Sequence, residues 1–388
     1  MTHLRTLSTR SLVAGVACLL AIVAAGTAAR IGLAGSSPAS PPKPLDEAIH
    51  DALATPAPTG LTARITFTND LFPASALPGQ AASPLLTDAS GRLWVRNDGS
   101  GRIELQADQG DVQVVWGHRR LSVYDASSDT VYRASLPGAV GPDRAASGDQ
   151  PPTLADVDRA LAEIGLRWGL GQAAPTDVGG RPAYSVDGSP KADGGLLGVV
   201  QVAWDAANGT PLRLGVVAKR HTVPVLGLEL HDVAYAPVDA RDVALAPPPS
   251  ATVVDLDTSA TSHAGRPPVE GVAAVQGAVR FPLAAPDTLA GLPRVGVRLV
   301  GDDTALVVYR RGLDVVAVAE GAAGNASTSS GPLGALHALP EVAIGGATGH
   351  ELATQLGTVL EWSSAGIDRV LVGTLEPGTA EDAARRLS

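Results

Sequence analysis

The chain has 388 residues, of which 45% are hydrophobic, 18% charged and 3% aromatic, so a core is feasible but must be built from small aliphatic side chains. A chain of this length is expected to form two or three domains. Its formal net charge of -10, without basic clusters, excludes nucleic acid as the partner, because binding phosphate requires concentrated Arg and Lys.

The N-terminus predicts export. Arg5 and Arg10 precede an apolar stretch without charges at residues 11–29, which as a helix would be roughly 28 Å long, close to the hydrocarbon thickness of a bilayer. The basic end is expected to stay in the cytoplasm, so the rest of the chain lies outside. Gly26 and Ala28 suit a signal peptidase, whereas the length of the run suits a retained anchor. A secreted and a membrane-anchored protein therefore both remain open.

Cys18, the one cysteine of the chain, lies inside this stretch. The letters GVAC resemble a lipobox, but Leu19 and Leu20 continue the apolar run, which favours a thiol buried in the membrane over a lipidated one. The exported part then has no disulfide and no thiol chemistry. A Pro- and Ser-rich tether follows, so residues 1–40 are assigned to the signal or anchor and its tether.

The residues up to about 135 predict an antiparallel meander. A short helix is expected at 45–53 and a first strand at 61–68, where apolar residues alternate with Thr and Arg. Three alternating runs follow between 90 and 117, separated by Gly, Asp, Asn or Ser, and RLSVYDA and DTVYRAS add two more strands. The strands share one apolar face, because successive side chains of a strand point to opposite sides.

Two segments are expected to cover that apolar face. Residues 69–90 are long, irregular and rich in Leu, as a lid would be. Residues 153–168 predict a helix with Thr153 as N-cap and Asp156 three residues on. Its apolar residues recur at helical spacing and form one stripe: Leu154, Val157, Leu161, Ile164 and Trp168. The stripe would either pack against the sheet as part of a filled core or form one wall of a ligand cavity.

A second meander and a second unit complete the chain. Asn208-Gly209 marks a hairpin turn within the second meander. Residues 256–275, rich in Ser, Thr, Ala and Pro, predict a linker. Residues 276–388 contain further alternating runs and end in TAEDAARRL, which predicts a small antiparallel sheet covered by a helix.

The sequence carries no recognisable catalytic or metal-binding motif. The sequence has no nucleophile elbow, phosphate-binding loop, dinucleotide fingerprint or CxxC. HELAT, starting at His350, resembles the beginning of a zinc-protease helix, but Thr354 stands where the second ligand should be. His118, His221 and His231 have no carboxylate or serine at a telling spacing. We therefore expect no enzyme, no metal and no cofactor.

Several segments resemble the LolA family of lipoprotein carriers and its relative RseB, a periplasmic regulator of an anti-sigma factor. AWDAANGTPLRL at 203–214 is similar to a strand and turn of the family, and residues 228–253 are similar to its closing strand and Pro-rich segment. RLSVYDASSDTVYRASLP resembles the strand pair before the family's central helix. Residues 366–387 resemble the last strand and helix of the smaller RseB domain. The Ala-rich composition indicates an actinobacterial type.

The resemblance implies an α+β fold. Residues 41–255 would form an incomplete antiparallel β-barrel covered by helices, and 276–388 a smaller sheet with a helix. The family's concave face accepts acyl chains or a lipoprotein, so the apolar faces predicted above become walls of a ligand cavity. Its expected lining is Leu61, Ile65, Phe67, Leu71, Phe72, Leu93, Val95, Ile103, Leu105, Val114, Val123, Leu161, Ile164 and Trp168.

Three functions remain open at this point. The first is an exported carrier or buffer that binds a lipid or an acylated lipoprotein. The second is an RseB-like envelope sensor whose partner is the exported domain of an anti-sigma factor. The third is a structural module with a filled core. The carrier and the sensor both require a ligand cavity, which the structural module lacks. The sensor also requires a surface for its protein partner.

Overall fold

The computed structural model describes residues 41–71, 83–108, 110–117, 119–135, 152–192, 195–256, 269–323 and 339–388. The expected membrane segment at 11–29, Phe72 and His118 lie outside these residues. Among the helices that are described, none combines the length and apolar character that a membrane span requires.

The first unit is built around one large sheet, which has 13 strands in the described part of the chain. Its order is β13-β6-β5-β4-β3-β2-β1-β12-β11-β10-β9-β7, with β8 paired to β9. The strands are β1 (Gly60–Asn69), β2 (Ala89–Arg96), β3 (Gly101–Ala107), β4 (Gly110–Gly117), β5 (Arg120–Asp125), β6 (Thr130–Ser135), β7 (Trp168–Leu170), β8 (Ala174–Val178), β9 (Arg181–Pro190), β10 (Leu197–Asp205), β11 (Pro211–Ala218), β12 (Leu226–Ala234) and β13 (Thr252–Leu256).

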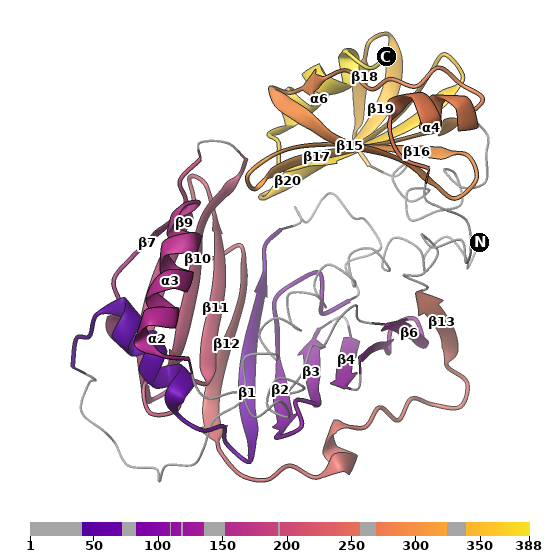
Figure 1. Cartoon of the computed structure of the whole chain (residues 1–388). Coiled ribbons are helices and arrows are strands. Elements are labelled where there is room, and N and C mark those ends of the chain that lie inside the picture. Colours follow the sequence, from indigo (N-terminus) through magenta and orange to yellow (C-terminus); the bar gives the residue numbers. More distant parts are fainter. Residues whose placement is uncertain are drawn as a thin grey trace.

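This sheet curls without closing. Figure 1 shows a curved wall that runs from β13 through β1 to β9 and β7. Neighbouring strands pair in antiparallel fashion, except that β13 runs parallel to β6. In the described residues the two ends of the sheet do not pair with each other. The predicted fold class, an incomplete antiparallel barrel followed by a smaller sheet with helices, is confirmed.

Helices α2 (Leu45–Ala54) and α3 (Leu154–Gly165) cover one end of the curled sheet. Ala48 of α2 is buried against Tyr184 of β9 and Trp204 of β10. Helix α3 lies beside α2 and β7. The predicted cap of α3 is present, because the Thr153 hydroxyl accepts from the Asp156 N–H while the Asp156 carboxylate accepts from the Thr153 N–H.

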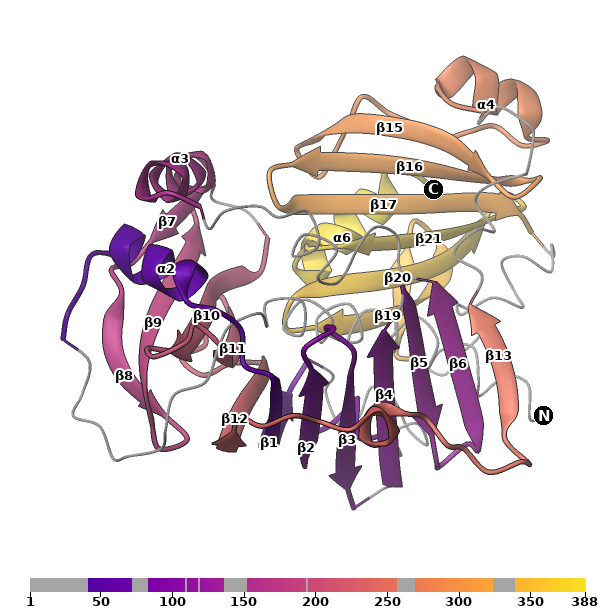
Figure 2. The same cartoon turned by 60° about the horizontal axis from the view of Figure 1, so that its bottom comes forward.

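Residues 235–251 form a strap that crosses the sheet on its way from β12 to β13 (Figure 2). The strap contains the short 3-10 helix η2 (Ala240–Val243), which contacts β2 and β3. Its Ala244 carbonyl accepts a hydrogen bond of 3.3 Å from Arg102 Nη1. A Cβ on Gly60 would lie 2.4 Å from the Ala236 carbonyl oxygen, so a glycine is needed where the strap meets β1.

The second unit is a separate sheet, eight-stranded in the described residues, in the order β14-β15-β16-β17-β21-β20-β19-β18. Helices α4 (Val272–Ala278) and α6 (Pro377–Arg385) bury Val275, Ala380, Ala383 and Ala384 in its core. The unit therefore begins before α4, where Glu270 bridges Arg298. Its strands are β14 (Thr288–Leu289), β15 (Leu292–Val300), β16 (Thr304–Arg311), β17 (Asp314–Ala322), β18 (Glu341–Ile344), β19 (Ala347–Thr354), β20 (Gly357–Ser364) and β21 (Ile367–Gly373).

Candidate functional site

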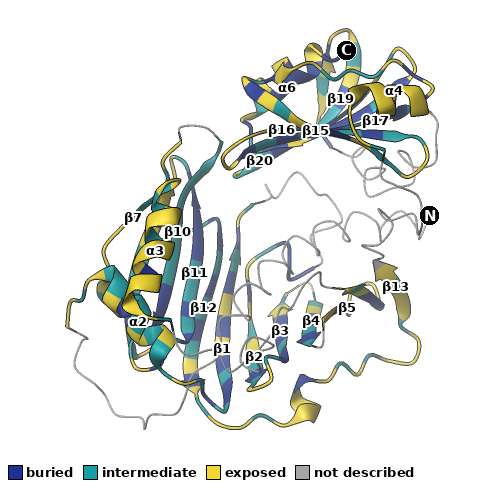
Figure 3. Cartoon of the chain, viewed as in Figure 1, coloured by how far each residue is buried: buried dark blue, intermediate teal, exposed yellow. Residues whose placement is uncertain are grey.

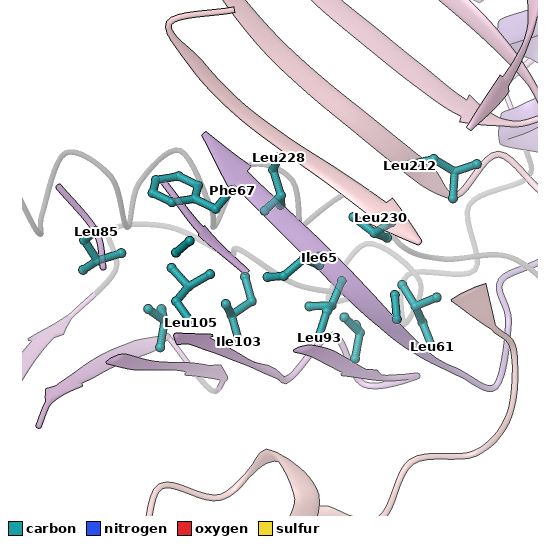
Figure 4. Close-up of a cluster of buried hydrophobic side chains, with 14 of the residues drawn as sticks. Leu61, Ile65, Phe67, Leu85, Leu93, Ile103, Leu105, Leu212, Leu228 and Leu230 are labelled. Carbon is teal, nitrogen blue, oxygen red and sulfur yellow. The ribbon is translucent and has the colours of Figure 1, made fainter. Parts of the chain in front are cut away.

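One face of the curled sheet carries a continuous group of apolar side chains, the apolar cluster (Figure 4). Strand register brings the members together, because Leu93 lies opposite Ile103, Ile103 opposite Val114, and Val114 opposite Val123. Nine residues expected to line the site belong to it, and none is more than 4% exposed. They are Leu61, Ile65, Phe67, Leu93, Val95, Ile103, Leu105, Val114 and Val123.

The remaining expected lining residues lie elsewhere or at the margin. Leu71 is half-buried and packs against the apolar cluster, and Phe72 lies outside the described residues. Leu161, Ile164 and Trp168 do not join the cluster, and Ile164 is 47% exposed. The reason is that α3 leads directly into β7 and packs beside α2. The apolar stripe of α3 therefore lies at the β7 end of the sheet, away from strands β2 to β6.

Strands β11 and β12 extend the apolar cluster beyond the expected lining. Leu228 lies opposite Phe67 and Leu230 opposite Ile65 in the pairing of β12 with β1. Figure 4 shows these leucines beside the side chains of β1, together with Leu212 of β11. The alternation in VLGLEL at 225–230 was a signal for them. Sequence reasoning missed their role because it assigned the site to the first meander.

The described end of the connection between β1 and β2 lies on the apolar cluster. Leu85 is 1% exposed and packs into it. Asn69, at the end of β1, holds this segment: its Nδ2 donates to the Leu85 carbonyl at 2.6 Å, and its backbone N–H donates to Asp88 Oδ1 at 2.9 Å. Its Oδ1 also accepts from the Leu71 N–H at 3.1 Å. We call Asn69 and the segment 83–88 the latch; both lie within residues 69–90, which the sequence predicts as a lid, although no motif marked the hydrogen bonds of Asn69.

The turn that carries the family-like AWDAANGTPLRL segment has a structural role. Asp205 Oδ1 accepts from the Ala207 N–H at 2.8 Å, and Asn208 Oδ1 accepts from the Thr210 N–H at 3.0 Å. Gly209 has φ of 71°, and a Cβ there would lie 2.6 Å from the Ala52 carbonyl oxygen of α2. These residues therefore shape a tight turn on which α2 docks.

Asp205, which begins this turn, also belongs to a buried polar network. The Asp205 side chain, 2% exposed, pairs with Arg181 at 3.1 Å and accepts from the Tyr235 hydroxyl at 2.7 Å. The Arg181 guanidinium lies 4.5 Å from the centre of the Tyr235 ring. Burial and the Asp205 carboxylate raise the pKa of Tyr235, so its hydroxyl remains a donor. The network ties β9, β10 and the start of the strap together.

In the part of the chain that the structure describes, the second unit contacts the apolar cluster through the turn between β19 and β20. The Gln355 N–H, in the turn between β19 and β20, donates to the Leu71 carbonyl at 3.4 Å. The neighbouring Leu356 packs against the cluster itself. A further ion pair between the units joins Arg220 and Glu376 at 3.2 Å. The second unit therefore contacts the apolar cluster close to the latch.

His231 and His350, two of the described histidines, lie on different sheets. His231 lies on the face opposite the apolar cluster, 3.2 Å from the Thr66 hydroxyl. His350 stands opposite Glu361 in the pairing of β19 with β20. Within the described ranges no three His, Cys, Asp or Glu side chains are arranged to hold a metal ion.

Several solved structures are similar to this chain at low identity. The MucA/MucB complex of Pseudomonas aeruginosa gives a TM-score of 0.42 at 16% identity, covering 88% of this chain and 94% of that one. A LolA superfamily protein from Nitrosomonas europaea gives 0.23 at 10% identity, covering 52% and 98%. A putative outer membrane lipoprotein-sorting protein domain from Vibrio parahaemolyticus gives 0.21 at 9% identity, covering 47% and 88%. No protein-family model and no curated protein sequence matches the chain.

Proposed function

We propose that this protein is an exported, non-enzymatic LolA-like carrier or buffer that binds an acyl chain of a lipid or lipoprotein at the apolar cluster. The supporting observation is the one-sided construction of the curled sheet. A broad apolar face spans β1 to β6 and continues onto β11 and β12. Part of this face is covered by residues 83–88, which form turns and bends, are held by Asn69 and pack Leu85 into the cluster. Such a cover can be displaced at lower cost than a packed helix, because fewer contacts must break.

The physical driving force for this binding is the burial of methylene groups. Each CH2 group removed from water contributes about 0.8 kcal/mol. About ten of them would gain roughly 8 kcal/mol, which exceeds the lower estimates of the cost of association. The apolar lining consists mostly of Leu, Ile, Val, Ala and Phe, whose side chains carry no polar group that an acyl chain would leave unpaired.

A direct test uses residues 41–388, purified from the native host, extracted with organic solvent and examined by mass spectrometry. A fluorescent fatty acyl probe is then titrated into the wild type and into Val114→Asp. Val114 is 1% exposed at the centre of the apolar cluster. Val307→Asp is the matched control, because Val307 is fully buried in the core of the second unit.

The expected result is that an amphiphile co-purifies with the wild type and that the probe binds it saturably. Val114→Asp should abolish probe binding. Val307→Asp should bind as much probe per folded molecule as the wild type. Binding is scored against the folded fraction measured by circular dichroism, since both changes bury a charge and destabilise. If the wild type carries no amphiphile and binds no probe, the protein is a structural module with a filled core.

A second candidate function is an RseB-like sensor that binds the exported domain of an anti-sigma factor. The favouring observation is the contact of Gln355 and Leu356 with Leu71 and the apolar cluster. Through it, a ligand that displaces the latch would disturb the second unit. The test is affinity for the exported domain of an anti-sigma factor encoded beside this gene, measured with and without the acyl probe. An affinity that the probe leaves unchanged would exclude the sensor.

A further inference from the structure

The face of the curled sheet opposite the apolar cluster holds an open groove of about 780 Å³, the polar groove. It lies over β12, β1, β2 and β3, and the strap crosses the same face. Its principal side chains are Arg64, Thr66, Arg92, Trp94, Glu104 and Gln106. Nothing in the proposed acyl binding uses this groove, because the two faces of a sheet are separated by its backbone.

Strand register arranges these side chains in rows. Arg64 lies opposite Arg92, and Arg92 lies opposite Glu104. In the next row Ser90 lies between Thr66 and Gln106. Residues opposite each other on one face are about 5 Å apart. The groove floor is thus a grid of hydrogen-bonding groups with fixed spacing.

An irregularity in β12 adds two more side chains to the groove. Pairing with β1 shifts register between Thr62 and Arg64, and Asp232 has φ of 49°. As a result His231 and Asp232 both line the groove. Asp232 pairs with Arg64, and His231 contacts Thr66. Positive φ is uncommon outside glycine and tends to occur where function requires a strained backbone.

Trp94 supplies an aromatic surface at the edge of this grid. The Arg102 guanidinium lies 5.8 Å from the centre of its ring. Arg102 is itself held by the Glu104 carboxylate and by the Ala244 carbonyl of the strap. The half-buried indole therefore contacts a guanidinium that is itself held in place, and a side chain restricted in this way loses little entropy when a ligand stacks on it.

The composition of the groove selects the class of ligand. Its polar lining excludes an acyl chain, because many polar groups would lose water without a partner. Its charged side chains are of both signs, with Arg64 paired to Asp232 and Glu104 paired to the neighbouring Arg102, so the groove lacks the concentrated positive charge that a strongly anionic ligand requires. Among the described residues, the side chains of Ser90, Arg92 and Gln106 make no hydrogen bond or ion pair, so they are available to hydroxyl groups.

We propose that the polar groove binds a short neutral oligosaccharide, with the C–H face of one sugar ring on Trp94 and its hydroxyls on Arg92, Glu104 and Gln106. Sugar hydroxyls donate and accept, so they can satisfy guanidinium, carboxylate and amide groups together. This site is independent of the acyl-binding function proposed above and lies on the other face of the sheet.

The test is isothermal titration of the full chain, held in a polyoxyethylene detergent without sugar, with cellotetraose, maltotetraose, mannotetraose and N-acetylchitotetraose. Saturable binding of at least one is expected. Trp94→Ala and Arg92→Ala should each weaken it by about tenfold or more. Arg133→Ala is the matched control and should bind as the wild type, because Arg133 is exposed on β6, outside the groove.

Three outcomes would overturn the proposal. They are failure of all four sugars to bind, equal binding by wild type and both groove variants, and binding of an unstructured peptide pool instead of the sugars. Should Trp94→Ala fail to fold by circular dichroism, Gln106→Ala replaces it, since Gln106 is exposed. Acyl-probe binding should be unchanged in Arg92→Ala, so failure here is distinguishable from failure of the acyl site.

Discussion

Helices α3 and α6 are both short, amphipathic and attached to a sheet, yet they are packed in different ways (Figure 3). Ala380, Ala383 and Ala384 of α6 are at most 2% exposed. In α3, which is fully described, Val157 is the buried residue, and Ile164 is 47% exposed. The alanines let α6 approach β20 closely, as tight packing requires. In the described residues the second unit is thus closed by a packed helix, whereas no helix contributes to the apolar cluster of the first unit.

The largest expected effect that separates the two units is the loss of a core aromatic in the second. Trp362 is 1% exposed in its hydrophobic core. Trp362→Ala should cost about 3–5 kcal/mol of the free energy of unfolding, because a large cavity replaces the indole. Urea unfolding followed by circular dichroism measures the cost. Val372→Ala is the control, since Val372 is 48% exposed; an equal loss in both variants would contradict a filled second core.

A smaller effect is expected at the latch of the first unit. Asn69→Ala removes the hydrogen bonds to Leu85 and Leu71, at a cost of about 1–2 kcal/mol. Because the cover is loosened, the acyl probe should also associate faster in stopped-flow fluorescence. Asp70→Ala is the neighbouring control, since Asp70 is exposed. Slower association in Asn69→Ala would show that the latch does not restrict access to the apolar cluster.

The second unit should also show a dependence on pH that arises at Glu361. Burial raises the pKa of Glu361 to about 7. The folded state therefore holds the Glu361 proton more tightly than the unfolded state, so the contribution of this group to stability is fully present below pH 4.5 and is lost as the pH rises through about 7. Glu361→Gln should be more stable than the wild type at pH 8 by on the order of 1 kcal/mol, after allowance for solvent screening. At pH 4 the wild type and the variant should have the same free energy of unfolding. If the two proteins were also equally stable at pH 8, the raised pKa of Glu361 would be contradicted.

The smallest effect is expected on the exposed stripe of α3. Ile164→Ser should change the free energy of unfolding by no more than about 0.5 kcal/mol, because the side chain is already in contact with water. Thermal unfolding of the wild type and the variant measures the change. A loss above about 2 kcal/mol would mean that α3 seats its stripe in solution, as α6 does.

Local patterns determined much of the structure. Period-two alternation placed Leu93, Ile103 and Val114 on one face, and the cap at Thr153 marked the start of α3, because strand pleat and helix capping depend on neighbouring residues. The resemblance of AWDAANGTPLRL to a family segment correctly marked a turn, where Asp205 and Gly209 act through contacts within a few residues.

The tertiary structure alone decided which faces meet. Periodicity gave α3 an apolar stripe, but only packing against α2 and β7 placed that stripe away from the meander. The hold of Asn69 on Leu85 spans 16 residues, and the pair of Arg64 and Asp232 spans 168. Such contacts depend on how the sheet curls and on a local shift in strand pairing. The curl of the sheet and the shift in strand pairing both result from the balance of many weak interactions along the chain, so no short motif predicts either of them.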